Sequence, residues 1–273
     1  MTRTGMVLAL VLVLGLAGCS PGQSPAAPRV VCVTTRPLQL LVEALVNASV
    51  EVRVLSTDGI IPVQNAASVI KESAILFVSG LSEDAWATSL AGQSVQIVRL
   101  SDALQKGSAQ NSCLSFRNST DMARLIRDAL ISFYPSEKAD FDTRYATFLD
   151  QCSQADGRLK QQFWKTAVRA FIAADGTWVD AAGDYGLRII IQPSVRSIDP
   201  ASTKSAAAID AWGAQEHTHT IVLNDAGIQK AQVVHEENGV IVCKLDAAGA
   251  AAGGGFVSWL EVQLTALSQS LEK

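Results

Sequence analysis

The chain has 273 residues, a formal net charge of −4 and 18% charged residues. A mildly acidic chain lacks the basic surface that nucleic-acid binding requires, so nucleic acid is excluded as a partner. The length is sufficient for one large lobe or two small lobes with hydrophobic cores of their own.

The N-terminus has the pattern of a bacterial lipoprotein signal peptide. Arg3 provides a positive n-region, residues 6–16 are uninterruptedly apolar, and Leu16-Ala17-Gly18-Cys19 is a small-residue cleavage site that ends on cysteine. The apolar run is too short for a permanent transmembrane helix. We therefore expect residues 1–18 to be removed and Cys19 to be lipidated, which places the protein in the cell envelope outside the cytoplasmic membrane. A plain secretory signal with a chance cysteine is the weaker alternative.

After a lipidated flexible tether at 19–28, runs rich in Val and Ile alternate with helical patterns. In the first part we predict strands at 30–33, 50–55, 75–78 and 95–98, and helices at 38–46, 63–71 and 121–133. In the second part we predict strands at 168–173, 187–191, 220–223 and 240–245, and helices at 178–185, 203–212, 228–236 and 256–271. Such alternation is typical of mostly parallel sheets covered on both faces.

One long amphipathic helix is predicted between the two parts, over residues 136–163. Its apolar residues recur at spacings of three and four, namely Phe141, Tyr145, Phe148, Cys152, Ala155, Leu159 and Phe163. The expected fold class is therefore α/β, with two lobes of mostly parallel sheets joined by one long backbone helix. We expect an N-terminal lobe at 29–135, the linking helix at 136–165 and a C-terminal lobe at 166–273.

Four cysteines remain in the mature chain after Cys19. They are Cys32, Cys113, Cys152 and Cys243. The absence of CxxC and CxxH pairs argues against a zinc cage. Outside the cytoplasm disulfides are permitted, so the sequence leaves open whether these residues are buried thiols or paired in bridges.

Several segments in chain order carry a likeness to a known family. They are residues 50–59 (VEVRVLSTDG), 72–81 (ESAILFVSGL), 184–187 (DYGL), 197–202 (SIDPAS), 239–249 (GVIVCKLDAAG) and 256–267 (FVSWLEVQLTAL). Over nearly the whole mature chain, their order and spacing resemble the substrate-binding lipoproteins of ABC transporters for zinc and manganese. The resemblance implies capture of a solute between two lobes and delivery to an ABC permease. We expect a monomer that is held at a membrane by its N-terminal lipid.

The metal ligands of that family are mostly replaced. Members of the family typically bind their metal with three histidines and one carboxylate. The loop that carries the first histidine is shortened here, and an alternative alignment without the gap, which we do not favour, puts Asp58 at that position. By the same resemblance the second histidine falls on Asn111, the third falls on Asp175, and the aspartate is retained as Asp246.

Oxygen ligands alone do not suit zinc, which prefers imidazole and thiolate. A set made of Asp175, Asp246 and Asn111 suits a harder ion such as magnesium, calcium or manganese. One interpretation is therefore a metal receptor with a rebuilt site. Another is a site that binds no metal, in a receptor for a different solute or an accessory lipoprotein beside a transporter. Asp175 also fits a purely structural role as the cap of a helix at Thr177 and Trp178.

The surroundings of Asp175 support a cleft at this place. It follows the predicted strand 168–173 and precedes a helix, which is where ligands bind in open α/β sheets. We expect Trp178, three residues further on, and Asn224, after the strand 220–223, to line the cleft.

The histidines and the catalytic motifs complete the sequence reading. His217 and His219 would lie on one face of a strand and could chelate a metal together, although a solvated surface pair opposite the cleft is the more ordinary reading. His235 is expected at the end of the helix 228–236. The sequence contains no GxSxG, HExxH, Walker or Rossmann motif. We therefore expect a binding protein rather than an enzyme.

Overall fold

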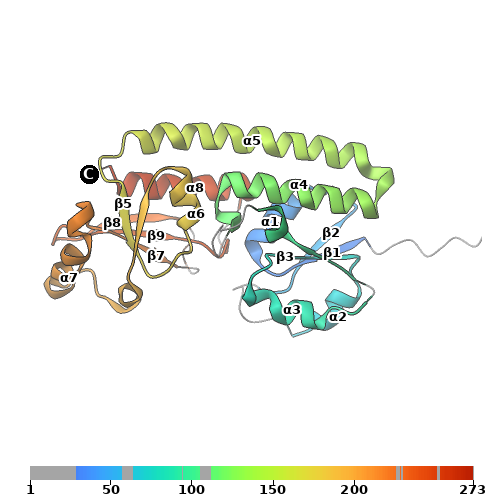
Figure 1. The fold of residues 1–273 in the computed structure, drawn as a ribbon, viewed down its shortest axis with the longest axis horizontal. Coiled ribbons are helices and arrows are strands. Elements are labelled where there is room, and N and C mark those ends of the chain that lie inside the picture. The colour runs from blue at the N-terminus through green and yellow to red at the C-terminus, as the bar shows by residue number, and fades with distance from the viewer. Residues whose placement is uncertain are drawn as a thin grey trace, which may run out of the picture.

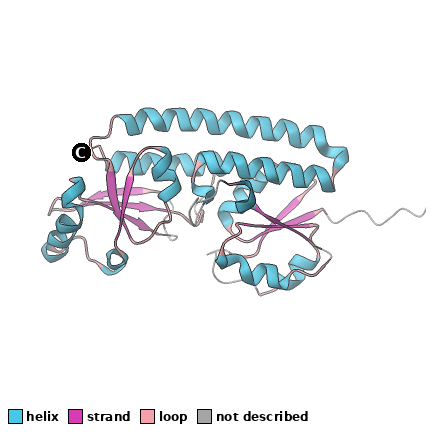
Figure 2. Cartoon of the chain, viewed as in Figure 1, coloured by secondary structure: helices cyan, strands magenta, loops and turns pink. Residues whose placement is uncertain are grey.

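The computed structural model describes residues 29–56, 64–93, 95–104, 112–225, 228, 230–250 and 253–272. Two β-sheets lie side by side, and a layer of long helices extends across both (Figures 1 and 2). Within the described ranges, no helix is both long enough and apolar enough to cross a membrane. The predicted α/β class, with two mostly parallel sheets and one long helix, is confirmed.

The N-terminal sheet has the strand order β2-β1-β3-β4, and all its pairings are parallel. Its strands are β1 (Val30–Val33), β2 (Glu51–Val54), β3 (Ile75–Val78) and β4 (Gln96–Arg99). Helices α1 (Arg36–Glu43) and α4 (Phe116–Phe133) cover one face, and α2 (Ala66–Lys71) and α3 (Ala85–Leu90) cover the other. The central strand β3 is buried along its whole length because helices cover both of its faces.

The C-terminal sheet has the order β6-β5-β7-β9-β8. Its strands are β5 (Ala170–Ala173), β6 (Arg188–Ile191), β7 (Thr220–Asn224), β8 (Gln232–His235) and β9 (Ile241–Leu245). All pairings are parallel except that of β8 with β9. Helix α7 (Thr203–Gly213) covers one face, and α6 (Val179–Asp184) and α8 (Phe256–Ser270) cover the other.

The prediction of a helix at 228–236 is wrong, because residues 232–235 form the antiparallel edge strand β8. His235 therefore lies on a strand rather than at a helix end. A tight turn causes the difference: the Gly239 N–H donates to the Glu236 carbonyl at 3.0 Å, and Gly239 has a φ of +85°. The Asn238-Gly239 pair is a strong hairpin signal, and it takes precedence over the helix-like spacing of the apolar residues before it.

The predicted start of the helix 121–133 is also wrong, because this helix, α4, begins at Phe116. The Oγ of Ser115 accepts a hydrogen bond from the Asn118 backbone N–H at 3.2 Å and so caps the helix earlier. Helix α3 was not predicted at all.

Helix α5 (Lys138–Trp164) is the long linking helix. Its 27 residues correspond to a length of about 40 Å. The apolar stripe predicted from the sequence is buried except for Tyr145, which is half-buried. The first half of α5 packs against α4 of the N-terminal lobe and the second half against α8 of the C-terminal lobe (Figure 1). Both lobes are therefore attached to one rigid element.

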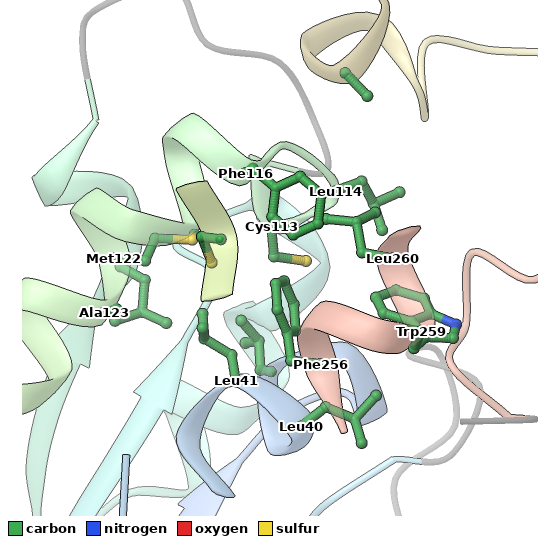
Figure 3. Packing of buried hydrophobic residues seen from close by; sticks show 14 of the residues in the cluster. Leu40, Leu41, Cys113, Leu114, Phe116, Met122, Ala123, Phe256, Trp259 and Leu260 are labelled. Atoms are coloured by element: carbon green, nitrogen blue, oxygen red, sulfur yellow. The ribbon is translucent and has the colours of Figure 1, made fainter. Parts of the chain in front are cut away.

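Helix α8 belongs to the C-terminal lobe but begins inside the N-terminal one. Figure 3 shows Phe256, Trp259 and Leu260 of α8 beside residues of α1 and of the segment that leads into α4. The ring centroid of Phe256 lies 6.0 Å from that of Phe148 on α5. One continuous hydrophobic core therefore extends from the N-terminal lobe into the C-terminal lobe.

The four cysteines of the mature part are all free and buried. The sequence left bridges and thiols open, and the structure shows thiols. Burial raises the pKa of Cys113, Cys152 and Cys243 to about 12. These side chains consequently stay protonated at neutral pH and behave as small apolar residues.

We expect Phe148→Ala to lower the free energy of unfolding by about 3–5 kcal/mol, because it leaves a cavity where α5 meets α8. Trp164 on the same helix is 88% exposed, so Trp164→Ala is a matched control that should change stability by about 0.5 kcal/mol or less. Urea unfolding followed by circular dichroism measures both variants. Equal effects of the two substitutions would contradict the role of α5 described above.

Candidate functional site

The carboxyl ends of three neighbouring strands bring the candidate residues of the C-terminal lobe to one edge of the sheet. Ala173 of β5, Val222 of β7 and Cys243 of β9 lie level with one another. Asp175, Asn224 and Asp246 follow two or three residues further along these strands. Strands β5 and β9 are separated only by β7, which corresponds to about 10 Å. The structure thus places the predicted residues Asp175, Asn224 and Asp246 along one edge.

Asp175 is held by donors from its own lobe. Its Oδ1 accepts hydrogen bonds from the Thr177 backbone N–H at 3.0 Å and from the Thr177 hydroxyl. Its Oδ2 accepts a hydrogen bond from Nη2 of Arg196, which lies in the turn after β6. The structural interpretation of Asp175 as a helix cap is wrong, because α6 (Val179–Asp184) has Trp178 at its N-cap position and no side-chain cap hydrogen bond; Asp175 instead closes a local turn with the Thr177 amide.

The pKa of the Asp175 carboxyl is lowered. Partial burial by itself would raise the pKa, but the hydrogen bonds from Thr177 and the guanidinium of Arg196 outweigh it. The carboxylate is therefore ionised at neutral pH. A cation that approached Asp175 would compete with the guanidinium of Arg196 rather than with a proton.

Trp178 and Asn224 contact each other directly. The indole N–H of Trp178 donates to the Asn224 side-chain oxygen at 2.7 Å. Trp178 is only 1% exposed, so the indole packs in the core, and its bond to Asn224 ties the loop after β5 to the end of β7. That these two residues line a cleft stays a prediction.

Asp246 lies deeper than Asp175 and is 0% exposed. Its backbone N–H donates to Oε1 of Gln263 on α8 at 2.8 Å. Gln263 is also buried, so the turn after β9 is fastened to the helix that enters the N-terminal lobe. The backbone of Asp246 is therefore held by α8.

The turn after Asp246 touches the N-terminal lobe. Gly249 has a φ of +71°, and a Cβ placed on it would lie 3.4 Å from Cγ of Arg36 at the start of α1. Thr34, the residue after β1, is 1% exposed, and its Oγ1 has no hydrogen-bond partner among the described residues. The strand ends of both lobes therefore border the region where the lobes meet.

Polar contacts beside this region also join the two lobes, between the start of α4 and helix α6. The Ser115 hydroxyl donates to Oδ2 of Asp184, and Nε of Arg117 lies 3.2 Å from Oδ1 of the same carboxylate. The Asn118 side-chain amide donates to Oδ2 of Asp180 at 3.0 Å. Asp184 also benefits from the positive end of the α4 dipole. We call this set of residues the α4–α6 latch.

The Asp184 carboxyl has a raised pKa, because burial outweighs the opposing effects of Ser115 and Arg117. Its side chain is 10% exposed. Keeping this group ionised at neutral pH therefore costs the folded state free energy.

Other predicted site residues lie elsewhere. Asp58, Asn111 and Cys19 fall outside the described residues. Among the residues that the structure describes, no group of three or more His, Cys, Asp or Glu side chains could hold a metal ion. His217 and His219 are exposed, and Nδ1 of His219 lies 2.8 Å from Oδ1 of Asp210 on α7.

Sequence reasoning did not identify Arg196, Gln263 or the α4–α6 latch. Arg196 is 21 residues from Asp175 and carries no motif. Ser115, however, begins a cap signal of the form S-x-x-N, which points to the start of α4. Asp184 belongs to the family-like segment DYGL, but nothing in that segment indicates its contacts with Ser115 and Arg117.

Comparisons with known proteins agree on the type of molecule. The family model described as zinc-uptake complex component A, periplasmic (ZnuA) matches residues 31–270. No curated protein sequence matches the chain. A mutant structure of the laminin-binding adhesin Lmb from Streptococcus agalactiae is 18% identical, has a TM-score of 0.71, and the alignment covers 88% of this chain and 98% of that one.

Two further solved structures are similar, and their titles name a bound metal. The Zn(II)-bound ZnuA-like domain of Streptococcus pneumoniae AdcA is 16% identical with a TM-score of 0.71, over 89% of this chain and 99% of that one. The Mn-bound periplasmic metal binding protein from Candidatus Liberibacter asiaticus is 15% identical with a TM-score of 0.70, over 89% and 99%. At these identities the similarity shows the fold alone.

We expect Asp184→Asn to flatten the dependence of stability on pH. A folded-state pKa above the unfolded value means that the contribution to stability is complete below the unfolded pKa and is lost as the pH rises through the folded pKa. Asparagine still accepts the Ser115 hydrogen bond but does not titrate. Between about pH 4 and pH 7 the variant should therefore lose less unfolding free energy than the wild type.

Urea titrations at several pH values test this expectation. Asp150→Asn, which removes an exposed carboxylate of α5, is the control and should leave the pH profile unchanged. Identical profiles for the wild type and Asp184→Asn would contradict it.

Proposed function

This chain belongs to the periplasmic zinc-uptake complex component A family, and from that premise we propose that it is the extracytoplasmic solute receptor of a metal ABC transporter with an altered site. What supports the proposal is the two-lobed frame on α5, together with the position of Asp175 and Asp246 just after the carboxyl ends of β5 and β9. The family consists of solute-binding receptors rather than enzymes.

The proposed ligand is a divalent cation of the harder kind, with manganese as the first candidate. Asp175 and Asp246 would supply carboxylate oxygens, Asn111 would supply an amide oxygen, and waters would complete the shell. Asp58 would be a further ligand only in the alignment without the gap, which we do not favour. Oxygen donors of this type favour manganese or magnesium over zinc. The similar structures named with Zn(II) or Mn support a divalent metal as the class of ligand.

A solute other than a metal, or an accessory role beside a transporter, is the second candidate. It is favoured by the contacts of Asp175, both of whose oxygens already have donors. In this case the same region between the lobes would hold a polar solute, and Trp178 and Asn224 would shape its wall.

Capture in this receptor would involve little movement of whole lobes. Helix α5, the shared core around Phe256 and the α4–α6 latch all join the two lobes. Hinge closure needs a few residues that absorb large changes in φ and ψ, whereas here the connection is a helix of 27 residues. Entry and release would therefore depend on local changes in the loops at the strand ends.

The proposed cellular setting is the outer side of a membrane, with the protein held there by a lipid on Cys19. The flexible segment 19–28 would give the receptor reach toward an ABC permease, its proposed partner. We propose that the protein works as a monomer, with lobes at 29–135 and 166–273 joined by residues 136–165. The signal-peptide pattern of residues 1–18 supports this setting.

Cys19→Ala should move the protein from the membrane fraction to the soluble fraction, because one acylated cysteine is the only anchor proposed. Fractionation of cells that express the full chain, with mass spectrometry of the N-terminal peptide, measures this. Ser20→Ala is the control and should stay with the membrane. A Cys19→Ala protein that remains in the membrane fraction would exclude lipidation as the anchor.

Isothermal titration of the mature chain with MnCl2, MgCl2 and ZnCl2 tests the ligand. We expect manganese to bind and both Asp175→Asn and Asp246→Asn to weaken its affinity at least about tenfold, because each removes one charged ligand. Asp150→Asn should leave binding unchanged. If no cation produces a binding heat with the wild type, the metal receptor is excluded and a non-metal solute becomes the candidate to test.

A further inference from the structure

We propose that Arg196 is a specificity-determining residue of the site, because its guanidinium competes with a bound cation for the Asp175 carboxylate. This inference rests on the proposed function, in which Asp175 is a ligand. It adds a residue that neither the sequence motifs nor the family resemblance identified. A metal ion that binds Asp175 has to displace Arg196, and the affinity of the receptor for cations is lowered accordingly.

The contacts of Asp175 support this competition. Nη2 of Arg196 donates to Oδ2, while the backbone N–H and hydroxyl of Thr177 donate to Oδ1. The Thr177 contacts come from a turn two residues away and would persist with a metal present, since each carboxylate oxygen has two lone pairs. Arg196 differs, because a guanidinium beside the same oxygen repels a divalent ion.

The backbone holds Arg196 at this place. Arg196 lies in a short 3-10 helix, Pro193–Ser197, directly after β6. The preceding residue, Val195, is 0% exposed and belongs to the core cluster that includes Ile172 and Ile221. The position of the Arg196 backbone is consequently fixed by the core of the lobe, next to the strand end that carries Asp175.

The side chain, in contrast, is free to leave. The Arg196 side chain is 68% exposed and that of Asp175 is 30% exposed. An ion pair with this exposure is weak, so a cation can displace the guanidinium without any change in the backbone. Arg196 thus lowers affinity by a modest factor and does not close the site.

The charge explains why this position affects selectivity. The Asp175–Arg196 ion pair has no net charge. A ligand therefore binds the carboxylate only if its interaction with Asp175 is stronger than that of the guanidinium. Removing the positive charge should restore a negative carboxylate at the strand end. We expect the gain to be about fivefold in cation affinity, the upper limit for an exposed pair.

The experiment compares the mature wild type with Arg196→Gln and Arg196→Lys by isothermal titration with MnCl2 and ZnCl2. Glutamine keeps a hydrogen-bond donor but no charge, and lysine keeps the charge. We expect Arg196→Gln to bind at least one cation about fivefold more tightly than the wild type and Arg196→Lys to stay close to the wild type. The double variant Arg196→Gln with Asp175→Asn should lose the gain.

Arg188 offers a matched control for the change in net charge. Arg188 is the first residue of β6 and therefore lies at the amino end of the strand that Arg196 follows at its carboxyl end. Its side chain is 72% exposed and forms an ion pair with Glu216. Arg188→Gln should therefore leave cation affinity unchanged. Thermal unfolding of every variant confirms that each is folded.

The outcomes separate this inference from the proposed function. Tighter binding by Arg196→Gln supports the inference even if the wild type binds no metal, a result that would remove the metal ligand from the proposed function. Binding by the wild type with unchanged affinity in Arg196→Gln overturns the inference alone. The inference is also overturned if neither the wild type nor Arg196→Gln binds a cation. It is overturned as well if the gain in cation affinity persists in the double variant with Asp175→Asn, or if Arg188→Gln shows the same gain.

Discussion

The packing of one helix against both lobes is the constraint on which the rest of the molecule depends. Helix α5 contacts α4 with its first half and α8 with its second, and Phe148 lies near its middle against Phe256. Burial of large aromatic rings supplies much of the free energy that keeps these helices together. The distance between the two sheet edges is thereby set by the helical layer, and the loops at those edges are the parts left to adapt to a ligand.

The polar residues of the α4–α6 latch and of the loop after β5 already have side-chain partners. Asp184 accepts from Ser115 and lies beside Arg117, and Asp175 accepts from Thr177 and Arg196. Such pairings satisfy charges that partial burial would otherwise penalise. The two carboxylates differ in consequence: the pKa of Asp175 is lowered and that of Asp184 is raised. The first is the carboxylate that we propose as a cation ligand, while the second joins α6 to the start of α4.

The sequence predicted the features that depend on local periodicity. The strands at 30–33 and 75–78 and the buried stripe of α5 follow from apolar spacing alone. The same spacing indicates a helix at β8, but the turn at Gly239 makes the segment a strand. The position of Asp175 shortly after β5 follows from the sequence, but its contact with Arg196 does not, because loop geometry brings the two together. Ser115 and Asp184 meet across 69 residues for the same reason.

The start of α8 in the N-terminal lobe has a consequence for the order in which the chain folds. Leu40 and Leu41 are made early in synthesis, but Phe256, which lies beside them in Figure 3, is close to the C-terminus. Domains usually fold as units while the ribosome is still adding residues behind them. Here one part of the first lobe's core, the part beside α1, is covered only when the last helix is made. The packing of the first lobe is therefore complete only after nearly the whole chain has been made, although its cluster on the α2–α3 side needs no residue beyond position 97.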